Sequence, residues 1–260
     1  MHNRIDQSST YLRQNDALNN SFNSNSFDEQ LADLARHNDL SPEDRPERMG
    51  CCASRADASD PARMSTSVFQ YRTAELPNAN VENICVGLAA EWLTNRAQSP
   101  ASRMRALLPR SSGYRSAAVT QENYEDVIRS LRSQGVEGFE ANFRARAAVF
   151  ADAGLRPSEG GNTYAFDNSD EFSEMKDKIV SNERMYLLSL SFERGGRTEK
   201  HLVATSASDG IVTLFDPNYG EFTIPQGDVN DFFGSLANRY RSPPNSMELR
   251  SITTQRIRVE

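Results

Sequence analysis

Residues 83–93 read NICVGLAAEWL, and the expected arrangement of the other segments follows from this sequence. Apolar residues follow Cys85 at intervals of three, four, seven and eight positions, which is the spacing of one helix face. These residues are Leu88, Ala89, Trp92 and Leu93. The pattern predicts an amphipathic helix that begins at Cys85.

A cysteine at the start of a helix can be a nucleophile or a packing residue. The unpaired N–H groups at a helix N-terminus carry partial positive charge, which favours the nucleophilic thiolate over the thiol. A small buried cysteine on a core helix is the alternative, because free Cys is among the most buried residue types. The choice depends on whether a base lies beside Cys85.

The composition of the chain excludes several classes of protein. Its 260 residues suffice for one sizeable domain with extensions. A net charge of −7 argues against general nucleic-acid binding. Three cysteines, two of them adjacent, do not make a disulfide framework and favour a reducing compartment. We expect neither a transmembrane helix nor ordinary signal-peptide export, because no suitable apolar run is present.

The first part of the chain is not expected to build a folded core. Residues 1–30 are rich in Ser and Asn, with few apolar side chains, so burial cannot offset the entropy cost of ordering. We interpret residues 1–49 as a disordered secretion leader and residues 50–65 as an acylation segment and linker. A single domain is then expected over residues 66–260.

The linker contains a possible lipidation signal at Met49-Gly50-Cys51-Cys52. Gly50 followed by Ser54 fits N-myristoylation if Gly50 is an N-terminus, with Cys51 and Cys52 as palmitoylation sites. An internal glycine has no free amine, so the signal requires a cut between Met49 and Gly50. A second acyl chain would be needed for stable anchoring, because one chain binds membranes only marginally. The alternative is a linker of small residues with two incidental cysteines.

From Val68 on, apolar residues recur regularly, first at helical and then at strand spacing. Helical spacing predicts further helices at 100–108, 120–134, 139–153 and 169–179. Ser99 and Thr120 are the expected N-caps of the first two. Alternation then predicts strands at 185–193, 201–207, 211–216 and 221–224, a helix at 229–240, and a closing strand at 247–259. Helices followed by an antiparallel sheet indicate an α+β domain.

The dipeptide Asp209-Gly210 fixes which strand residues face one another. Asp-Gly between alternating apolar runs predicts a two-residue hairpin loop, which places Val203 opposite Asp216. His201 shares a strand face with Val203, since side chains alternate with period two. We therefore expect His201 and Asp216 to be diagonal neighbours whose side chains can meet.

His201 is the one histidine of the expected domain, because His2 and His37 both lie in the leader. A carboxylate beside it would hold the tautomer of the ring, whose other nitrogen would face the thiol. Taken singly, His201 is better explained as a polar residue at a strand start, and Asp216 can be the first residue of an Asp-Pro-Asn turn. Together with Cys85 they make up a nucleophile, a base and an orienting carboxylate.

The blocks NICVGLAAEWL and HLVATSASDGIVTLFDPNYGEF resemble the YopT/AvrPphB family of type III-secreted cysteine proteases, and its rhizobial members most of all. The resemblance covers about residues 66–260. It implies a papain-like fold in which a helical subdomain carries Cys85 and an antiparallel sheet carries His201 and Asp216. It also implies that these three residues form a Cys-His-Asp triad.

The same resemblance implies self-cleavage between Met49 and Gly50, which would supply the free Gly50 amine. A bacterial effector would then be acylated at Gly50 and at Cys51 or Cys52, and would act at the plasma membrane of a host cell. Its substrate would be a host protein, with a cytoplasmic kinase as the class that the family suggests. We expect a monomer that needs no metal or cofactor and binds no nucleic acid.

The sequence departs from the family pattern around the histidine. Lys200 precedes it where relatives tend to have Gly, and Arg194 and Arg197 make the loop basic, which is expected to alter substrate choice. The backbone N–H of Cys85 is the natural first donor of an oxyanion hole. Asn80 or Asn83 would supply the second, and the sequence does not choose between them.

Two other functions stay open at this point. An acyltransferase or amidase can use the same three residues, because Cys-His-Asp chemistry does not dictate the acceptor. A module that only binds and masks a host protein needs none of them.

Overall fold

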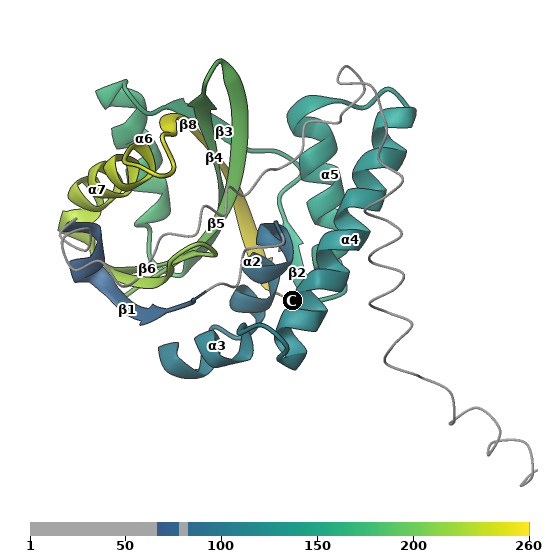
Figure 1. The fold of residues 1–260 in the computed structure, drawn as a ribbon, viewed down its shortest axis with the longest axis horizontal. Helices are drawn as coiled ribbons and strands as arrows, with labels where there is room; N and C mark the ends of the chain where they lie inside the picture. The colour runs from purple at the N-terminus through teal and green to yellow at the C-terminus, as the bar shows by residue number, and fades with distance from the viewer. Residues whose placement is uncertain (1–66, 78–82, 260) are drawn as a thin grey trace, which may run out of the picture. The chain divides into compact units, whose positions relative to one another are not determined.

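One antiparallel sheet of eight strands organises the protein, whose computed structural model describes residues 67–77 and 83–259. The strands are β1 (Arg72–Glu75), β2 (Leu155–Pro157), β3 (Asn162–Ala165), β4 (Arg184–Arg194), β5 (Arg197–Ser208), β6 (Ile211–Asp216), β7 (Gly220–Pro225) and β8 (Glu248–Val259). Their order is β1-β7-β6-β5-β4-β8-β2, with β3 also paired to β8 (Figure 1). The predicted leader, the acylation segment and Asn80 lie outside the described residues.

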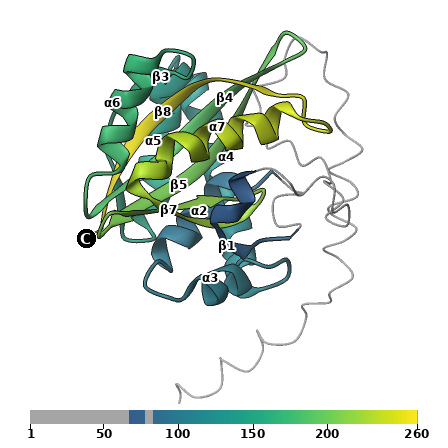
Figure 2. The same cartoon turned by 90° about the vertical axis from the view of Figure 1, so that its left-hand side faces the viewer.

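Helices cover both faces of this sheet. The helical segments are η2 (Ser67–Tyr71), α2 (Cys85–Thr94), α3 (Pro100–Ala106), α4 (Ser112–Ser133), α5 (Gly138–Ala151), α6 (Ser169–Ile179), η3 (Gln226–Asp228) and α7 (Val229–Arg241). Helices α6 and α7 lie on one face, and α2, α4 and α5 lie on the other (Figure 1, Figure 2). Within the described part of the chain, no helix is both long and apolar enough to cross a bilayer.

Alternation along the central strands divides the apolar side chains between two cores. Leu187 and Leu202 contribute to the core shared with α2, α4 and α5, whereas Leu188 and Val203 contribute to the core shared with α6 and α7. This is the period-two pattern of a strand that is covered on both faces. The expected α+β class is confirmed.

The hairpin register is the one that the sequence predicts. Asp209 and Gly210 have φ angles of 52° and 74°, as a type I′ turn requires, and Ala204 pairs with Phe215. Asp216 is the next residue of β6 and ends that strand. The placement of Asp216 therefore follows from the turn.

The start of the long helix α4 differs from the prediction. Thr120 was expected to cap it, but Ser111 is the N-cap, and Ser111 Oγ accepts a 3.0 Å hydrogen bond from the N–H of Tyr114. Thr120 lies inside the helix. The segment between them is helical because Tyr114 and Ala117 give it a buried face of its own.

Three short strands were not predicted: β1, β2 and β3. Each has only three or four residues, which is too short for alternation to identify a strand from the sequence. They form because a long partner strand offers unpaired backbone groups, as β8 does to β2 and β3.

A buried polar contact fastens α2 to the sheet. Trp92 Nε1 donates a 2.7 Å hydrogen bond to Glu221 Oε2, and the indole stacks on Phe215 at a centroid distance of 5.6 Å. Arg103 from α3 makes a two-pronged ion pair with the same carboxylate, with Nε and Nη2 at 2.7 and 2.5 Å. Since Phe215 directly precedes Asp216, this contact sets the position of α2 relative to the end of β6.

Helix α2 also packs closely against α4. A Cβ built on Gly87 would lie 1.8 Å from the carbonyl oxygen of Ala117. Only glycine permits this approach of the two helices, so the position of Cys85 depends on Gly87 as well as on the Trp92 contact.

Candidate active site

Cys85 begins α2, as the sequence predicts, and its side chain has no exposure to solvent. Ile84, the N-cap residue, offers no side-chain acceptor to the first turn. The N–H of Val86 donates a 3.0 Å hydrogen bond to Gln121 Oε1. The thiol therefore lies at a helix end whose partial positive charge favours a thiolate.

The side chains of His201 and Asp216 meet, as the predicted hairpin register requires. His201 Nε2 lies 2.8 Å from Asp216 Oδ1, and both side chains are buried. The ring also makes a hydrogen bond with the side chain of Cys85. Because Nε2 is bonded to Asp216, Nδ1 is the ring nitrogen left for the thiol. The structure thus brings together a thiol, an imidazole and a carboxylate from three separate segments.

The carboxylate of Asp216 is held by three donors. In addition to His201, the N–H of Asn218 donates to Oδ1 at 2.9 Å and the hydroxyl of Tyr240 donates to Oδ2 at 2.8 Å. Asn218 Nδ2 in turn donates to Tyr240 Oη at 2.9 Å. Burial and the charge of Asp216 raise the pKa of Tyr240 well above its usual value, so its hydroxyl stays a donor.

The surroundings of His201 favour its charged form. Burial opposes the charge, but the negative charge of Asp216 and the hydrogen bonds to Asp216 and Cys85 outweigh it. Together they raise the pKa of His201 from 6.5 to about 9. At neutral pH the ring is therefore protonated beside the thiol. A thiolate–imidazolium pair is the resting form that this geometry supports, and it is suited to attack on a carbonyl carbon.

Of the two residues expected to supply the second oxyanion donor, the structure describes Asn83 but not Asn80. Asn83 is exposed and has a φ of 60°, two residues before Cys85. Asn80 lies outside the described residues, as do Met49, Gly50, Cys51 and Cys52. The choice of the second oxyanion donor therefore stays a prediction.

Two neighbours of the site were missed from the sequence alone: Tyr240 and Asn218. The helical spacing of α7 places Tyr240 on a buried face, but no spacing rule identifies Asp216 as its partner. Asn218 was read only as part of a turn, where Asx residues commonly bond to nearby backbone groups. Its backbone N–H and its side chain both serve the carboxylate network.

Lys200, the residue before His201, lies on the face of the sheet that α5 covers. Lys200 Nζ lies 5.1 Å from the ring centroid of Phe139, near the start of α5. Phe139 is 40% exposed. The basic character of the loop is partly offset, because Arg194 Nη1 lies 3.7 Å from Glu199 Oε1.

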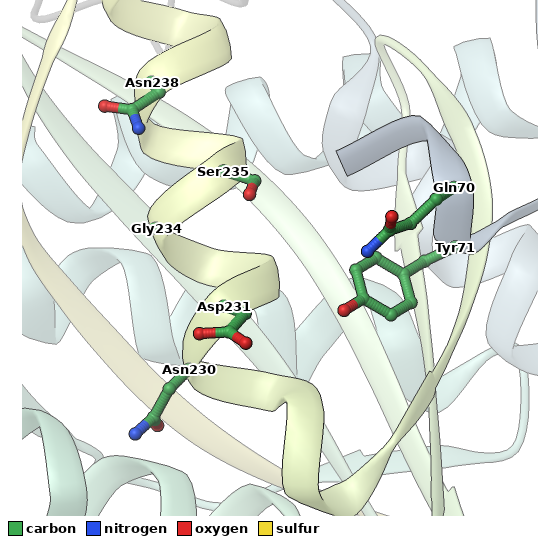
Figure 3. Close-up of a pocket in the computed structure, with 7 residues that line it drawn as sticks. All are labelled: Gln70, Tyr71, Asn230, Asp231, Gly234, Ser235 and Asn238. Carbon is green, nitrogen blue, oxygen red and sulfur yellow. The ribbon is translucent and has the colours of Figure 1, made fainter. Parts of the chain in front are cut away.

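A surface pocket of about 430 Å³ lies between η2 and α7 (Figure 3). Its lining is polar and comprises Gln70, Tyr71, Asn230, Asp231, Gly234, Ser235 and Asn238. None of these residues belongs to the Cys85, His201 and Asp216 cluster. The pocket is therefore separate from the reactive groups.

Comparisons with known proteins agree with this geometry. Residues 63–257 match the family described as Yersinia/Haemophilus virulence surface antigen, peptidase C58. A Bradyrhizobium diazoefficiens protein named as a YopT-like cysteine protease is 43% identical over 99% of this chain and 100% of its own length. A Sinorhizobium fredii protein of the same naming is 45% identical over 90% of this chain and 91% of its own.

A solved structure shows the same fold. The crystal structure of the Pseudomonas avirulence protein AvrPphB matches with a TM-score of 0.65 and 26% identity, covering 74% of this chain and all of that one. The papain-like arrangement is therefore confirmed, with Cys85 on the helical side and His201 and Asp216 on the sheet. The chain belongs to the C58 family of cysteine proteases, the YopT/AvrPphB family.

Proposed function

We propose that Cys85, His201 and Asp216 carry out the peptide cleavage. The Cys85 thiolate attacks the scissile carbonyl carbon, the C–N bond breaks, and His201 gives its proton to the leaving amine. Water then attacks the thioester carbonyl, and His201 takes up the water's proton as the C–S bond breaks. The acid product leaves, and the thiolate–imidazolium pair is restored. Asp216 keeps the ring oriented and balances its charge. The 2.8 Å contact between His201 and Asp216, beside the Cys85 thiol, is the observation that carries this assignment.

We further propose that the first bond cut is in the protein's own chain, between Met49 and Gly50. The support is the order of residues there: a glycine and two cysteines that would be ready for acylation once the glycine amine is free. Myristoylation of Gly50 and palmitoylation of Cys51 or Cys52 would give the two chains that stable membrane anchoring requires.

The full proposal is a type III-secreted effector that acts on a host protein at the plasma membrane. The relatives named above are YopT-like proteins of rhizobia and an avirulence protein of Pseudomonas, which supports delivery into a plant cell. The proposed substrate class is a cytoplasmic kinase, and the proposed working form is a monomer.

Expression of the full chain with and without Cys85→Ala tests the proposal, with the N-terminus of each product read by sequencing. The active chain is expected to begin at Gly50 and the variant at its original start. A Gly50 N-terminus in the variant would show that another protease makes the cut. Mass spectrometry of the active product made in a plant extract is expected to show myristate on Gly50.

Two outcomes would favour the other functions. A host protein that gains acyl mass, with no new N-terminus, would indicate an acyltransferase that uses the same residues. A cellular effect that survives both Cys85→Ala and His201→Ala would indicate a binding module.

A further inference from the structure

An arginine-rich stretch without acidic residues covers one end of the fold. The sequence between Glu91 and Glu122 contains five arginines and neither Asp nor Glu, although the whole chain carries a net charge of −7. One of the five, Arg103, is buried, and Glu221 balances its charge at 2.5 Å. The other four are exposed: Arg96, Arg105, Arg110 and Arg115. The positive charge is therefore a local feature and does not follow from the overall composition.

The four exposed arginines belong to one part of the fold, which we call the basic corner. It comprises residues 96–115, that is, α3, the loops on either side of it and the first turn of α4. Arg103 Nη1 donates a 2.7 Å hydrogen bond to the carbonyl oxygen of Arg96. Arg115 Nη1 donates a 2.8 Å hydrogen bond to the carbonyl oxygen of Arg110. Both views show α3 at the lower end of the described fold (Figure 1, Figure 2).

The exposed arginines of the basic corner have no carboxylate partners. Farther along the helices such pairs occur: Arg129 pairs with Asp126 on α4, and Arg144 pairs with Glu140 on α5. Among the residues that the structure describes, none of the four exposed arginines of the basic corner forms an ion pair. Charges of one sign that are gathered on a surface create a potential that attracts the opposite charge. The basic corner is therefore suited to an anionic partner.

An exposed apolar side chain lies beside these charges. Val119 is 56% exposed, more than any other large apolar side chain in the described part of the protein. It follows Arg115 by four positions in α4, so the two lie on the same face of the helix. Arginine and an apolar residue on one face favour the surface of an anionic bilayer, where the charge meets headgroups and the apolar group enters the interface. An acidic protein surface would attract the arginines but would not favour burial of Val119.

We propose that the basic corner binds the anionic surface of a lipid bilayer, with its four exposed arginines against the headgroups. The inference deepens the proposed membrane-bound function and rests on it for its setting. A single myristoyl chain anchors a protein only marginally, and a basic surface is one of the second signals that make anchoring stable. Cys85 begins the ten-residue helix α2, and Arg96 follows the other end of it, about 15 Å along the axis. The bilayer therefore meets the end of α2 that is away from the thiol.

The test measures how much of the full chain sediments with lipid vesicles. The chain carries Gly50→Ala, Cys51→Ser and Cys52→Ser, so no acyl chain contributes, and failure of the proposed self-cleavage would not change the result. Vesicles of phosphatidylcholine are compared with vesicles that also contain about one third phosphatidylserine. Binding is expected only to the anionic vesicles, and it is expected to weaken as salt is added, because salt screens exposed charges. Equal binding to both kinds of vesicle, or no binding to the anionic ones, would overturn the proposal.

A pair of double variants separates the basic corner from the net charge. Arg96→Gln with Arg105→Gln is expected to weaken binding to the anionic vesicles about 25-fold, since each arginine near such a surface contributes a factor of about five. Arg129→Gln with Arg144→Gln removes the same charge from another part of the surface. This control is expected to change binding about twofold at most, because the field of the bilayer falls off within a Debye length. Equal losses in the two double variants would overturn the proposal.

A further variant distinguishes a lipid surface from an acidic protein. Val119→Gln is expected to weaken binding to the anionic vesicles severalfold and to leave its dependence on salt unchanged, because it removes apolar contact and no charge. Polyglutamate serves as the probe for an acidic protein surface. If the chain bound polyglutamate as tightly as the anionic vesicles, and Val119→Gln had no effect on vesicle binding, an acidic protein would be indicated and the proposal would be wrong.

Discussion

The hydroxyl of Tyr240 donates a 2.8 Å hydrogen bond to Asp216 Oδ2, the carboxylate oxygen that His201 leaves free. The two oxygens of Asp216 are thus held from different directions, by the α7 helix on one side and by the ring on the other. Tyr240 is 1% exposed, and its ring lies 5.9 Å from that of His201. The orientation of the imidazole is therefore set partly by a residue that does not touch it through a hydrogen bond.

Tyr240→Phe is expected to lower kcat about tenfold with little change in KM. The variant keeps the ring and its packing but removes one charge-assisted hydrogen bond, which is worth about 1.5 kcal/mol or more. Steady-state kinetics on a cleavable peptide measures both constants. Tyr219→Phe is the matched control, because that hydroxyl bonds to Asn245 and not to the carboxylate, and its kcat is expected to stay near the wild-type value.

The raised pKa of His201 predicts how stability depends on pH. A group whose pKa is 6.5 unfolded and about 9 folded contributes stability that is fully present below pH 6.5 and is lost as pH rises towards 9. In a Cys85→Ala background, which removes the thiol's own titration, denaturant melts are expected to show this loss between pH 6.5 and somewhat below 9. Adding Asp216→Asn is expected to abolish it, and an unchanged slope would contradict the proposed charge pairing.

Gly87→Ala is expected to destabilise the protein by several kcal/mol and to lower activity with it. The added methyl carbon would lie 1.8 Å from the Ala117 carbonyl oxygen, so α2 and α4 must separate and Cys85 must shift. Thermal melts measure the loss. Gly234→Ala is the control within another helix, where a Cβ meets nothing within 4 Å. That variant is expected to be neutral or stabilising by about 0.5–1 kcal/mol.

Glu221→Gln is expected to reduce the free energy of unfolding by about 3–5 kcal/mol, because it leaves the buried charge of Arg103 uncompensated. Chemical denaturation measures the change. The exposed pair of Arg144 and Glu140 provides the comparison, since Glu140→Gln is expected to cost less than about 1 kcal/mol. If both variants lost the same free energy of unfolding, the buried ion pair between α3 and β7 would contribute no more to stability than an exposed pair does.

The core of the candidate site was predictable from sequence because it depends on local rules. A two-residue Asp209-Gly210 loop fixes the register, and period-two alternation then places His201 beside Asp216. Helical spacing likewise placed Cys85 at the first position of its helix. These rules do not predict how closely the α2 helix approaches the hairpin, because that distance depends on Gly87 and on the Trp92 contact.

Contacts between distant segments were beyond the reach of spacing arguments. Arg146 has the helical spacing of a buried residue, together with Asn142 and Val149, but its acceptors come from β4 and β8. Thr120 looks like a helix cap because it precedes polar residues, whereas Ser111 supplies the cap in the structure. The short strands β1 to β3 form only where a longer strand is already in place.

The most direct test of the account uses the full chain carrying Cys85→Ala as the substrate. A small amount of the unaltered protein is added, and the fragments are identified by N-terminal sequencing and mass spectrometry. The account predicts a single cut between Met49 and Gly50 when the unaltered protein is added, and no cut when Cys85→Ala or His201→Ala protein is added in its place. Cleavage by either variant at the same rate as by the unaltered protein would contradict it.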